Sequence, residues 1–245
     1  MPAIWLRLEP TQSSIQPIEN SLFFGTAFLS FMAVAYVPSF LEDRFQYEKE
    51  YRNGLYGAGA FITSNVLIGI PYLLIFSFTF AAPVYWLTNL RPTTSAFFTF
   101  VLWIFFNLLA SESQVVLAAA LFSNFVVTIA VFSLISGLWM CVSGFMVPLT
   151  ALNVFYKYVF FHWNFQKYVF ESLLVNELSE REYSCGSGCQ CMYISPSASQ
   201  CRVTGKAVLA QQGFPTEQNA KSIGIIVAII VGYRLVAYAV LKASK

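Results

Sequence analysis

Two long stretches of this chain carry no charged side chain, residues 20–41 and 53–90, and one dense cluster of charges separates them. About 20 consecutive apolar residues suffice to cross the hydrocarbon core of a bilayer. A charge at the centre of that core costs roughly 2.5–3.5 kcal/mol. The uncharged stretches therefore predict membrane-spanning helices, and the charge cluster between them must lie just outside the bilayer.

Composition extends this prediction to the whole chain, which is 57% hydrophobic, only 11% charged and unusually rich in Phe. Such values lie outside the range of soluble domains. A net charge of +2 without a basic patch excludes a nucleic-acid partner. We predict one all-α polytopic membrane domain over residues 1–245, embedded in a lipid bilayer. Its five spans are expected at about 20–41, 57–88, 94–122, 125–148 and 222–242.

Two segments lie outside these spans. Residues 42–53 form a short charged helix that ends at Asn53-Gly54, because Gly readily adopts the left-handed closing conformation. Such a helix offers a surface to a soluble partner, although a solvated loop joining two spans would have the same composition. Residues 157–221 are aromatic and amphipathic at first and then polar and rich in cysteine.

Four of the five cysteines crowd this last segment, with the spacing C-x3-C-x-C-x9-C; they are Cys185, Cys189, Cys191 and Cys201. Clustered cysteines indicate either two disulfides outside the cell or a zinc site inside it. The C-x-C pair lacks the matching C-x2-C partner of a zinc site, so the spacing favours disulfides and no metal. Three connectivities remain open.

The side of the membrane follows from these cysteines. If their loop is extracellular, counting the crossings places residues 42–52 in the cytoplasm, together with the tail that carries Lys242 and Lys245. The predicted protein is a multi-pass membrane protein, expected in the plasma membrane.

Three short motifs follow one another in the chain: Glu48 to Tyr56, with two Glu and Gly-x-Tyr; Ser143-Gly144 before Phe145-Met146; and Asn176-Glu177-Leu178. In this order they resemble the membrane domain of type-2 ABC transporters of the G (White) subfamily, most closely its fungal half-transporters. The third motif departs from the family's Asn-Glu-Phe. The resemblance covers nearly the whole chain and implies a coupling helix at 42–53, re-entrant helices and a Cys-rich extracellular loop.

The resemblance also implies roles for individual residues. Glu48, Glu50, Tyr51 and Arg52 would contact a nucleotide-binding domain. Phe145 and Met146 would form a plug before the outer exit. A cavity between two protomers would be lined by Phe23, Phe24, Phe28, Phe31, Ser133, Ser136, Gly137 and Met140. A helical stripe of Phe in so aromatic a chain also suits a lipid-facing or packing surface.

The family hydrolyses ATP, but this sequence holds no G-x-x-x-x-G-K-[ST] loop to bind its phosphates. No catalytic Ser/His/Asp set or carboxylate pair is present either, and the single His162 has no neighbouring ligand type. We therefore expect no enzyme and no cofactor on this chain. ATP and Mg would be bound by a nucleotide-binding domain that is missing or separate. Most of the family's first span is missing as well.

Glu112 and Arg234 are the two ionisable residues well inside predicted spans, at similar depth. Charges within the membrane are costly and usually have a partner, which suggests that the two residues pair or join a polar relay. Alternatively, Arg234 extends to the headgroups and Glu112 is protonated or bonded within its own helix.

Two functions remain open at this stage. The first is the membrane domain of an ATP-driven exporter that forms a homo- or heterodimer and moves lipophilic molecules such as a lipid, sterol or xenobiotic. The second is a truncated scaffold or regulatory partner of a full transporter, which transports nothing. Substitution of Glu50 distinguishes them, because only a coupled transporter depends on it.

Overall fold

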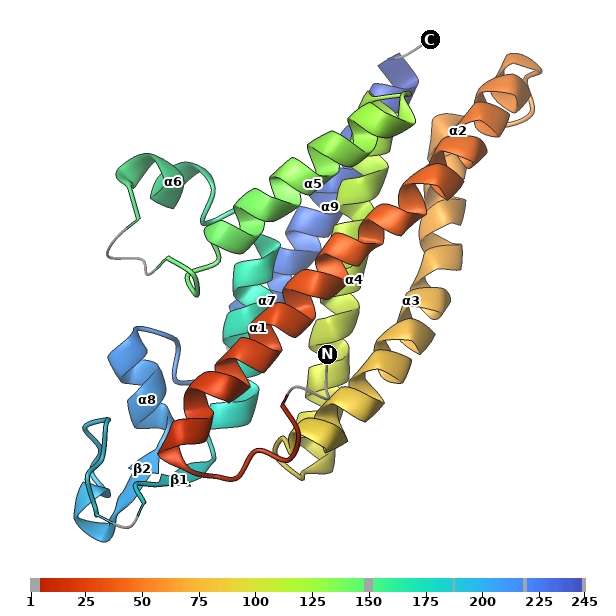
Figure 1. Cartoon of the computed structure of the whole chain (residues 1–245). Coiled ribbons are helices and arrows are strands. Elements are labelled where there is room, and N and C mark those ends of the chain that lie inside the picture. The colour runs from red at the N-terminus through yellow and green to blue at the C-terminus, as the bar shows by residue number, and fades with distance from the viewer. Residues whose placement is uncertain (1–4, 148–151, 187, 218–219, 244–245) are drawn as a thin grey trace. The chain divides into compact units, whose positions relative to one another are not determined.

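The computed structural model describes residues 5–147, 152–186, 188–217 and 220–243, and most of them are helical. The longer helices are α1 (Ile15–Met32), α2 (Val37–Arg52), α3 (Ala58–Thr88), α4 (Thr94–Leu121), α5 (Phe125–Cys141), α7 (Phe165–Leu178) and α9 (Ala220–Ala243), labelled in Figure 1. The shorter elements are α6 (Val154–Val159), α8 (Gly205–Gln212), β1 (Glu182–Ser184) and β2 (Arg202–Thr204).

The chain forms two compact units, and each is described by itself. The first comprises Met1–Thr26, Ser77–Ile104 and Tyr168–Ile223. The second comprises Ala27–Phe76, Phe105–Lys167 and Gly224–Lys245. Helices α1, α3, α4, α7 and α9 contribute residues to both units.

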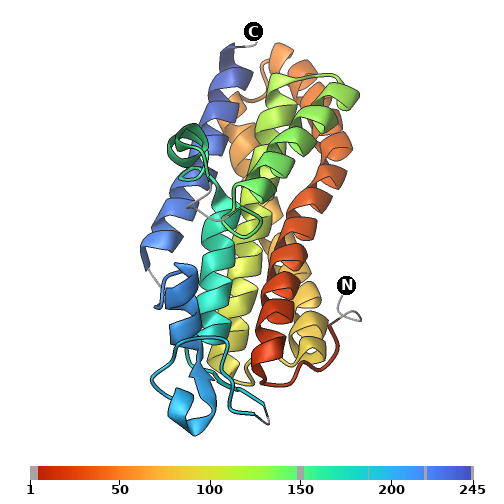
Figure 2. The ribbon, with the colours of Figure 1, turned by 60° about the vertical axis from the view of Figure 1, so that its left-hand side comes forward.

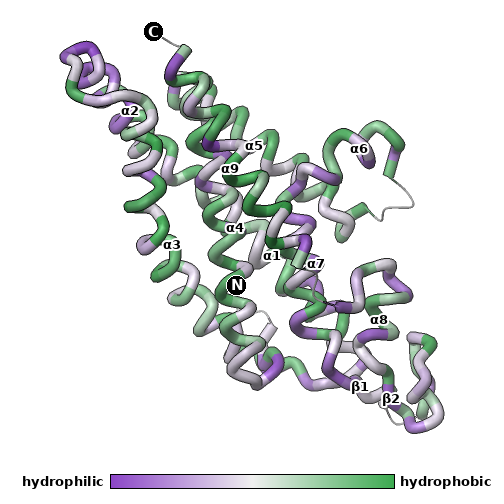
Figure 3. The backbone as a smooth tube through the Cα atoms, turned by 180° about the vertical axis from the view of Figure 1, so that it is seen from behind, coloured by the Kyte–Doolittle hydropathy of each residue, from purple (hydrophilic) through white to green (hydrophobic). Residues whose placement is uncertain are grey.

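Within the described residues, four helical stretches are long and apolar enough to cross a membrane: Gln12–Arg52, Ala58–Thr88, Thr94–Leu121 and Ala220–Ala243. The predicted class, an all-helical polytopic membrane protein, is confirmed. Hydrophobic residues run along these helices, whereas the last turns of α2 and the turn after it are hydrophilic (Figure 3).

The remaining predicted span, 125–148, is shorter in the structure. Helix α5 ends at Cys141 after 17 residues, which is at the lower limit for a bilayer crossing. Bends follow it, and Gly144 there has a φ of 93°, a conformation that an α-helix cannot contain. The last predicted residue, Pro148, lies outside the described residues.

The charged segment is not a separate short helix. It belongs to α2, which begins at Val37 and is joined to α1 by a single tight turn, Ala33–Tyr36, so that the chain continues as one long helical rod (Figure 2). Pro38 occupies the first turn of α2, where its missing N–H has no intrahelical role. The rod ends at Arg52, Asn53 caps it, and Gly54 follows with a φ of 75°.

Five helices meet in the hydrophobic core of the second unit. The Tyr47 ring of α2 stacks on Phe61 of α3, with ring centroids 4.7 Å apart and planes 16° apart. Three consecutive alanines of α4, Ala118, Ala119 and Ala120, are among the buried residues, and small side chains permit close helix packing. The buried members are Val37, Phe40, Leu41, Tyr47, Ala58, Phe61, Ile62, Val115, Val116, Ala118, Ala119, Ala120, Phe132, Ala237 and Leu241.

In the first unit, the end of α7 is tied to the first turn of α4 and to the loop before it. Asn176 Nδ2 donates to the Ala96 carbonyl at 2.9 Å, and the Arg91 amide donates to Glu177 Oε2 at 2.9 Å. Glu177 also pairs with Arg181. Burial raises the pKa of Glu177 to about 7, although the Arg91 amide and the Arg181 guanidinium act to lower it. The Asn-Glu pair of the third motif therefore closes this end of the unit.

The cysteine-rich loop follows α7. Strands β1 and β2 pair antiparallel, and disulfides join Cys185 to Cys191 and Cys189 to Cys201. This is one of the three connectivities that the sequence left open, and it leaves none of the four thiols to bind zinc. Gln12 holds the loop from the side, since its Nε2 donates to the Cys185 carbonyl at 3.0 Å and its Oε1 accepts from the Met192 amide at 2.9 Å.

Gly205, the first residue of α8, lies directly against the end of α7. Its amide donates to the Arg181 carbonyl at 2.9 Å, and a Cβ at this position would lie 1.8 Å from the carbonyl oxygen of Leu178. No side chain fits in that space. The close approach of α8 to α7 thus requires glycine at this position.

We expect Gly205→Ala to lower the thermal unfolding temperature of the detergent-purified protein by roughly 5 °C, because overpacking against backbone costs about 1–3 kcal/mol. Gly232→Ala is the matched control, since a Cβ there would have no atom within 4 Å. Equal unfolding temperatures for the two variants would contradict the close contact.

Candidate functional site

An ion pair lies inside the helices of the second unit. Arg234 of α9 and Glu112 of α4 are only 6% and 7% exposed, and the Arg234 Nη2 lies 2.7 Å from Glu112 Oε1. Arg234 Nε donates to Ser113 Oγ at 3.0 Å, and its Nη1 donates to Asn65 Oδ1 at 2.6 Å. The pairing that the sequence left open is formed, and every nitrogen of the guanidinium has a partner.

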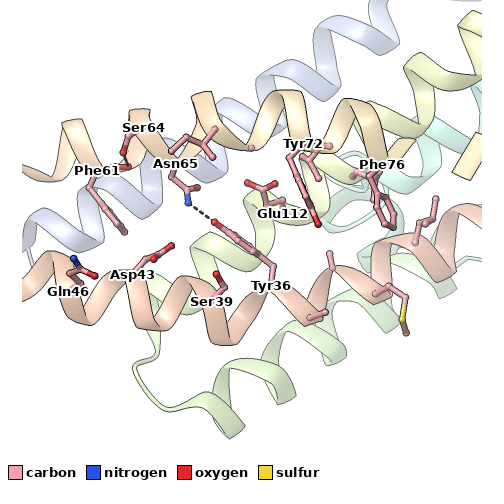
Figure 4. A pocket seen from close by; sticks show the side chains of 18 of the residues that line it. Tyr36, Ser39, Asp43, Gln46, Phe61, Ser64, Asn65, Tyr72, Phe76 and Glu112 are labelled. Atoms are coloured by element: carbon pink, nitrogen blue, oxygen red, sulfur yellow. Dashed lines mark hydrogen bonds between the residues drawn. The ribbon is translucent and has the colours of Figure 1, made fainter. Parts of the chain in front are cut away.

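The network continues onto α3 and towards α2. Asn65 Nδ2 donates to the Tyr36 hydroxyl at 2.6 Å, the bond drawn in Figure 4. Gly69 lets the Glu112 carboxylate approach the backbone of α3, because a Cβ there would lie 3.0 Å from Glu112 Oε1. A chain of polar contacts therefore connects α9, α4 and α3 with the turn between α1 and α2.

The end of α2 holds one carboxylate in a fixed position. Glu50 Oε2 accepts from the Tyr56 hydroxyl at 2.5 Å, and its Oε1 accepts from Gln46 Nε2 at 3.1 Å. The bond to Glu50 raises the pKa of Tyr56 to about 12, because losing the phenol proton would remove the donor. Gly54 reverses the chain so that Tyr56 can reach back, which explains the Gly-x-Tyr spacing after Glu50.

The other predicted coupling residues are engaged differently. Glu48 pairs with Arg44 at 3.1 Å, and the buried Arg44 also donates to the Ala119 carbonyl of α4 at 2.6 Å. The Tyr51 ring packs against Tyr47 at a centroid distance of 5.8 Å. Arg52 is exposed. Of this set, Arg52 is thus exposed and Glu50 is half-buried, and Glu50 is bonded to neutral groups alone among the described residues.

The predicted phenylalanine stripe divides into two kinds of environment. Phe23 is 2% exposed and packs edge-on against Phe170 at 5.5 Å within the first unit, so it cannot line a cavity. The α1 helix turns the other rings outwards, and Phe24, Phe28 and Phe31 are exposed.

On α5 the predicted residues also differ in exposure. Ser136 is buried and accepts from Gln114 Nε2 at 3.4 Å, whereas Gly137 is exposed and Ser133 and Met140 are half-buried. Of the two predicted plug residues after α5, Met146 is exposed and Phe145 is half-buried. The roles of these residues in a path between two protomers stay a prediction.

A cavity of about 720 Å³ lies within the second unit. Side chains of α3 and of the segment from α1 to α2 point towards each other across it, and Glu112 reaches it from α4 (Figure 4). The lining residues are Leu29, Met32, Ala33, Ala35, Tyr36, Ser39, Asp43, Gln46, Glu50, Tyr56, Phe61, Ser64, Asn65, Ile68, Gly69, Tyr72, Leu73, Phe76, Leu108 and Glu112.

Sequence reasoning missed this cavity and two partners of the ion pair, Asn65 and Ser113. Asn65 is an amide within a nearly continuous apolar helix, which is a signal that could have been used. Helix α3 offers little further pattern, because its apolar residues surround it on all sides and indicate no buried face.

Comparison with known proteins agrees with this architecture. The chain belongs to the ABC-2 type transporter family, whose family model matches residues 2–178. It is 26% identical over 99% of its length to ABC transporter G family member 23 of Arabidopsis thaliana. It is 30% identical over 89% of its length to G family member 5 of the same plant. A fungal relative, ABC transporter asL7 of Sarocladium schorii, is 25% identical over 94% of the chain.

The chain spans 38%, 32% and 17% of the length of these three relatives. The family match and the long apolar helices show that this chain is a transmembrane domain of a transporter and a multi-pass membrane protein.

We expect Glu112→Leu alone to destabilise the protein by about 3–5 kcal/mol, because it leaves Arg234 buried without its counter-charge. The double variant Glu112→Leu/Arg234→Met should regain most of that loss, since an apolar pair of similar volume removes both desolvation costs. Thermal unfolding and yield in the membrane fraction measure the stability of the single and the double variant. A double variant no more stable than the single one would contradict the pairing.

Proposed function

We propose that this chain is the membrane part of an ATP-driven exporter of the ABC G subfamily that moves lipophilic molecules. The observation that carries the proposal is the end of α2, where Glu50 is fixed by Tyr56 and Gln46 at the charged end of a helical rod. A carboxylate held in place by two neutral donors keeps its charge and is suited to contact a partner protein.

The packing of α2 provides the path for mechanical coupling. Val37, Phe40, Leu41 and Tyr47 are buried in the core of the second unit, and Arg44 binds the α4 backbone. A displacement imposed on the end of α2 therefore moves α3 and α4, because a close-packed interior transmits strain. In this mechanism, closure of the ATP-binding domains pushes on Glu50 and Arg52, with Glu48 and Tyr51 supporting the surface from behind.

ATP and Mg are bound, in this proposal, by a nucleotide-binding domain outside the present sequence, which has no phosphate-binding loop. The substrate path runs between two protomers, in a homo- or heterodimer, along the exposed rings Phe24, Phe28 and Phe31. The α5 residues Ser133, Gly137 and Met140 complete it, and Phe145 and Met146 close its outer end. The charged end of α2 faces the cytoplasm and the disulfide-bonded loop faces the outside, in the plasma membrane.

We expect Glu50→Ala to reduce ATP-driven transport of a lipophilic dye at least roughly tenfold, with ATP binding and membrane insertion unchanged. A coupled transporter loses transport in this way when the contact with the ATP-binding domain is broken. The measurement is dye transport into sealed inverted vesicles prepared from cells that express the protein.

Tyr56→Phe should give a smaller loss of the same kind, because it frees Glu50 without removing its charge. Glu42→Gln, which removes a charge about two turns earlier on α2, is the control and should transport normally. Normal transport in Glu50→Ala would contradict the coupling role. Complete absence of ATP-driven transport in the parent protein would favour a scaffold that transports nothing.

A further inference from the structure

The cavity of the second unit is acidic. Of the described residues that line it, three carry carboxylates, Asp43, Glu50 and Glu112, and none is Lys, Arg or His. Glu112 is neutralised by Arg234, which lies behind it on α9. Among the described residues, the Glu50 carboxylate receives bonds from the neutral groups of Tyr56 and Gln46 alone. Asp43 has no hydrogen bond or ion pair with any described residue, so two negative charges lack a counter-charge.

Aromatic rings provide the second feature of the cavity. Phe61, Tyr72 and Phe76 extend from α3 into it, and Tyr36 lies opposite them (Figure 4). Tyr72 is 71% exposed within this chain, so its ring is not packed into the core of the second unit. The face of an aromatic ring attracts a cation as well as apolar groups.

The carboxylates and the aromatic rings are distributed along the length of the cavity. Asp43 lies near Phe61, at the end of the cavity closest to the charged end of α2, whereas Tyr72 and Phe76 lie at the other end (Figure 4). From Phe61 to Phe76 the helix rises by about 22 Å. The volume, about 720 Å³, lies within the usual range of roughly 300–1,000 Å³ for sites of drug-sized ligands.

We propose that this cavity binds an amphiphilic cation, with its ammonium group between Asp43 and Glu50 and its apolar body along Ile68, Tyr72 and Phe76. A zwitterionic phospholipid does not fit equally well, because its phosphate would meet two carboxylates and no basic group. The site lies within one protomer and uses none of the residues assigned to the path between protomers. It shares Glu50 with the proposed coupling surface, but ligand binding at this site can be measured without transport.

The test is a fluorescence titration of the protein in lipid nanodiscs with a dansyl-alkyl-trimethylammonium probe. Its neutral counterpart, in which carbon replaces the nitrogen to give a tert-butyl group, has the same shape without the charge. The cationic probe should bind roughly tenfold more tightly than the neutral one. Equal affinity would overturn the proposal.

Three variants locate the site. Asp43→Asn should weaken binding of the cationic probe roughly five- to tenfold and leave binding of the neutral probe unchanged. Tyr72→Leu should weaken the cationic probe roughly threefold through loss of the ring face. Glu42→Gln removes the neighbouring charge, which does not line the cavity, and should bind as the parent does.

A reduction of the same size in Asp43→Asn and Glu42→Gln would show that only the general field of α2 attracts the probe, and would overturn the proposal. The proposal would also be overturned if excess phosphatidylcholine, or a purified partner protein, displaced the cationic probe equally from the parent and from Asp43→Asn.

Discussion

A guanidinium among apolar helices is costly unless its charge and its hydrogen bonds are all satisfied, and Arg234 meets both conditions through three other helical residues. Glu112 supplies the counter-charge, while Ser113 and Asn65 accept the remaining bonds. These partners come from α4 and α3, so the bonds fix the position of α9 along both helices. Loss of any partner would expose the full desolvation cost of a buried charge.

The same network determines what surrounds the cavity. Asn65 bonds the Tyr36 hydroxyl, and Gly69 makes room for the Glu112 carboxylate. Polar groups are thereby kept on the wall of a space that apolar side chains would otherwise fill. The end of α2 completes this wall with Asp43 and Glu50. A residue proposed to receive force from an ATP-binding domain thus also lines the proposed cation site, which would allow ligand binding and coupling to influence each other.

Much of the fold could be predicted from the sequence because the chain lacks charges over such long stretches. The spans around residues 57–88, 94–122 and 222–242 match α3, α4 and α9 closely. The rod from α1 to α2 could not be predicted, because Pro38 suggests a kink where it in fact occupies the first turn of a new helix. Helix α5 ends at Cys141, earlier than hydropathy alone indicated, and Gly144 follows with a positive φ.

The candidate site was predictable only in part. Glu112 and Arg234 were identified because charges stand out within spans, and Glu50 because of its spacing from Gly54 and Tyr56. The direction in which each Phe of α1 points could not be predicted from the sequence, since a helix that is apolar on all sides has no distinctive face. Phe23 is accordingly buried while its neighbour Phe24 is exposed. The disulfide pairing and the cavity depend on tertiary contacts that no local pattern specifies.

The account depends most on the charged end of α2 and the disulfide-bonded region lying on opposite sides of the membrane. Single cysteines at Lys49 and at the exposed Glu217, in a Cys141→Ala background, can be labelled with a membrane-impermeant maleimide. We expect Glu217→Cys to react in intact cells and Lys49→Cys to react only after the membrane is permeabilised. Labelling of both positions from the same side would contradict the account, because the account requires the end of α2 to be cytoplasmic and the disulfide-bonded region to be extracellular.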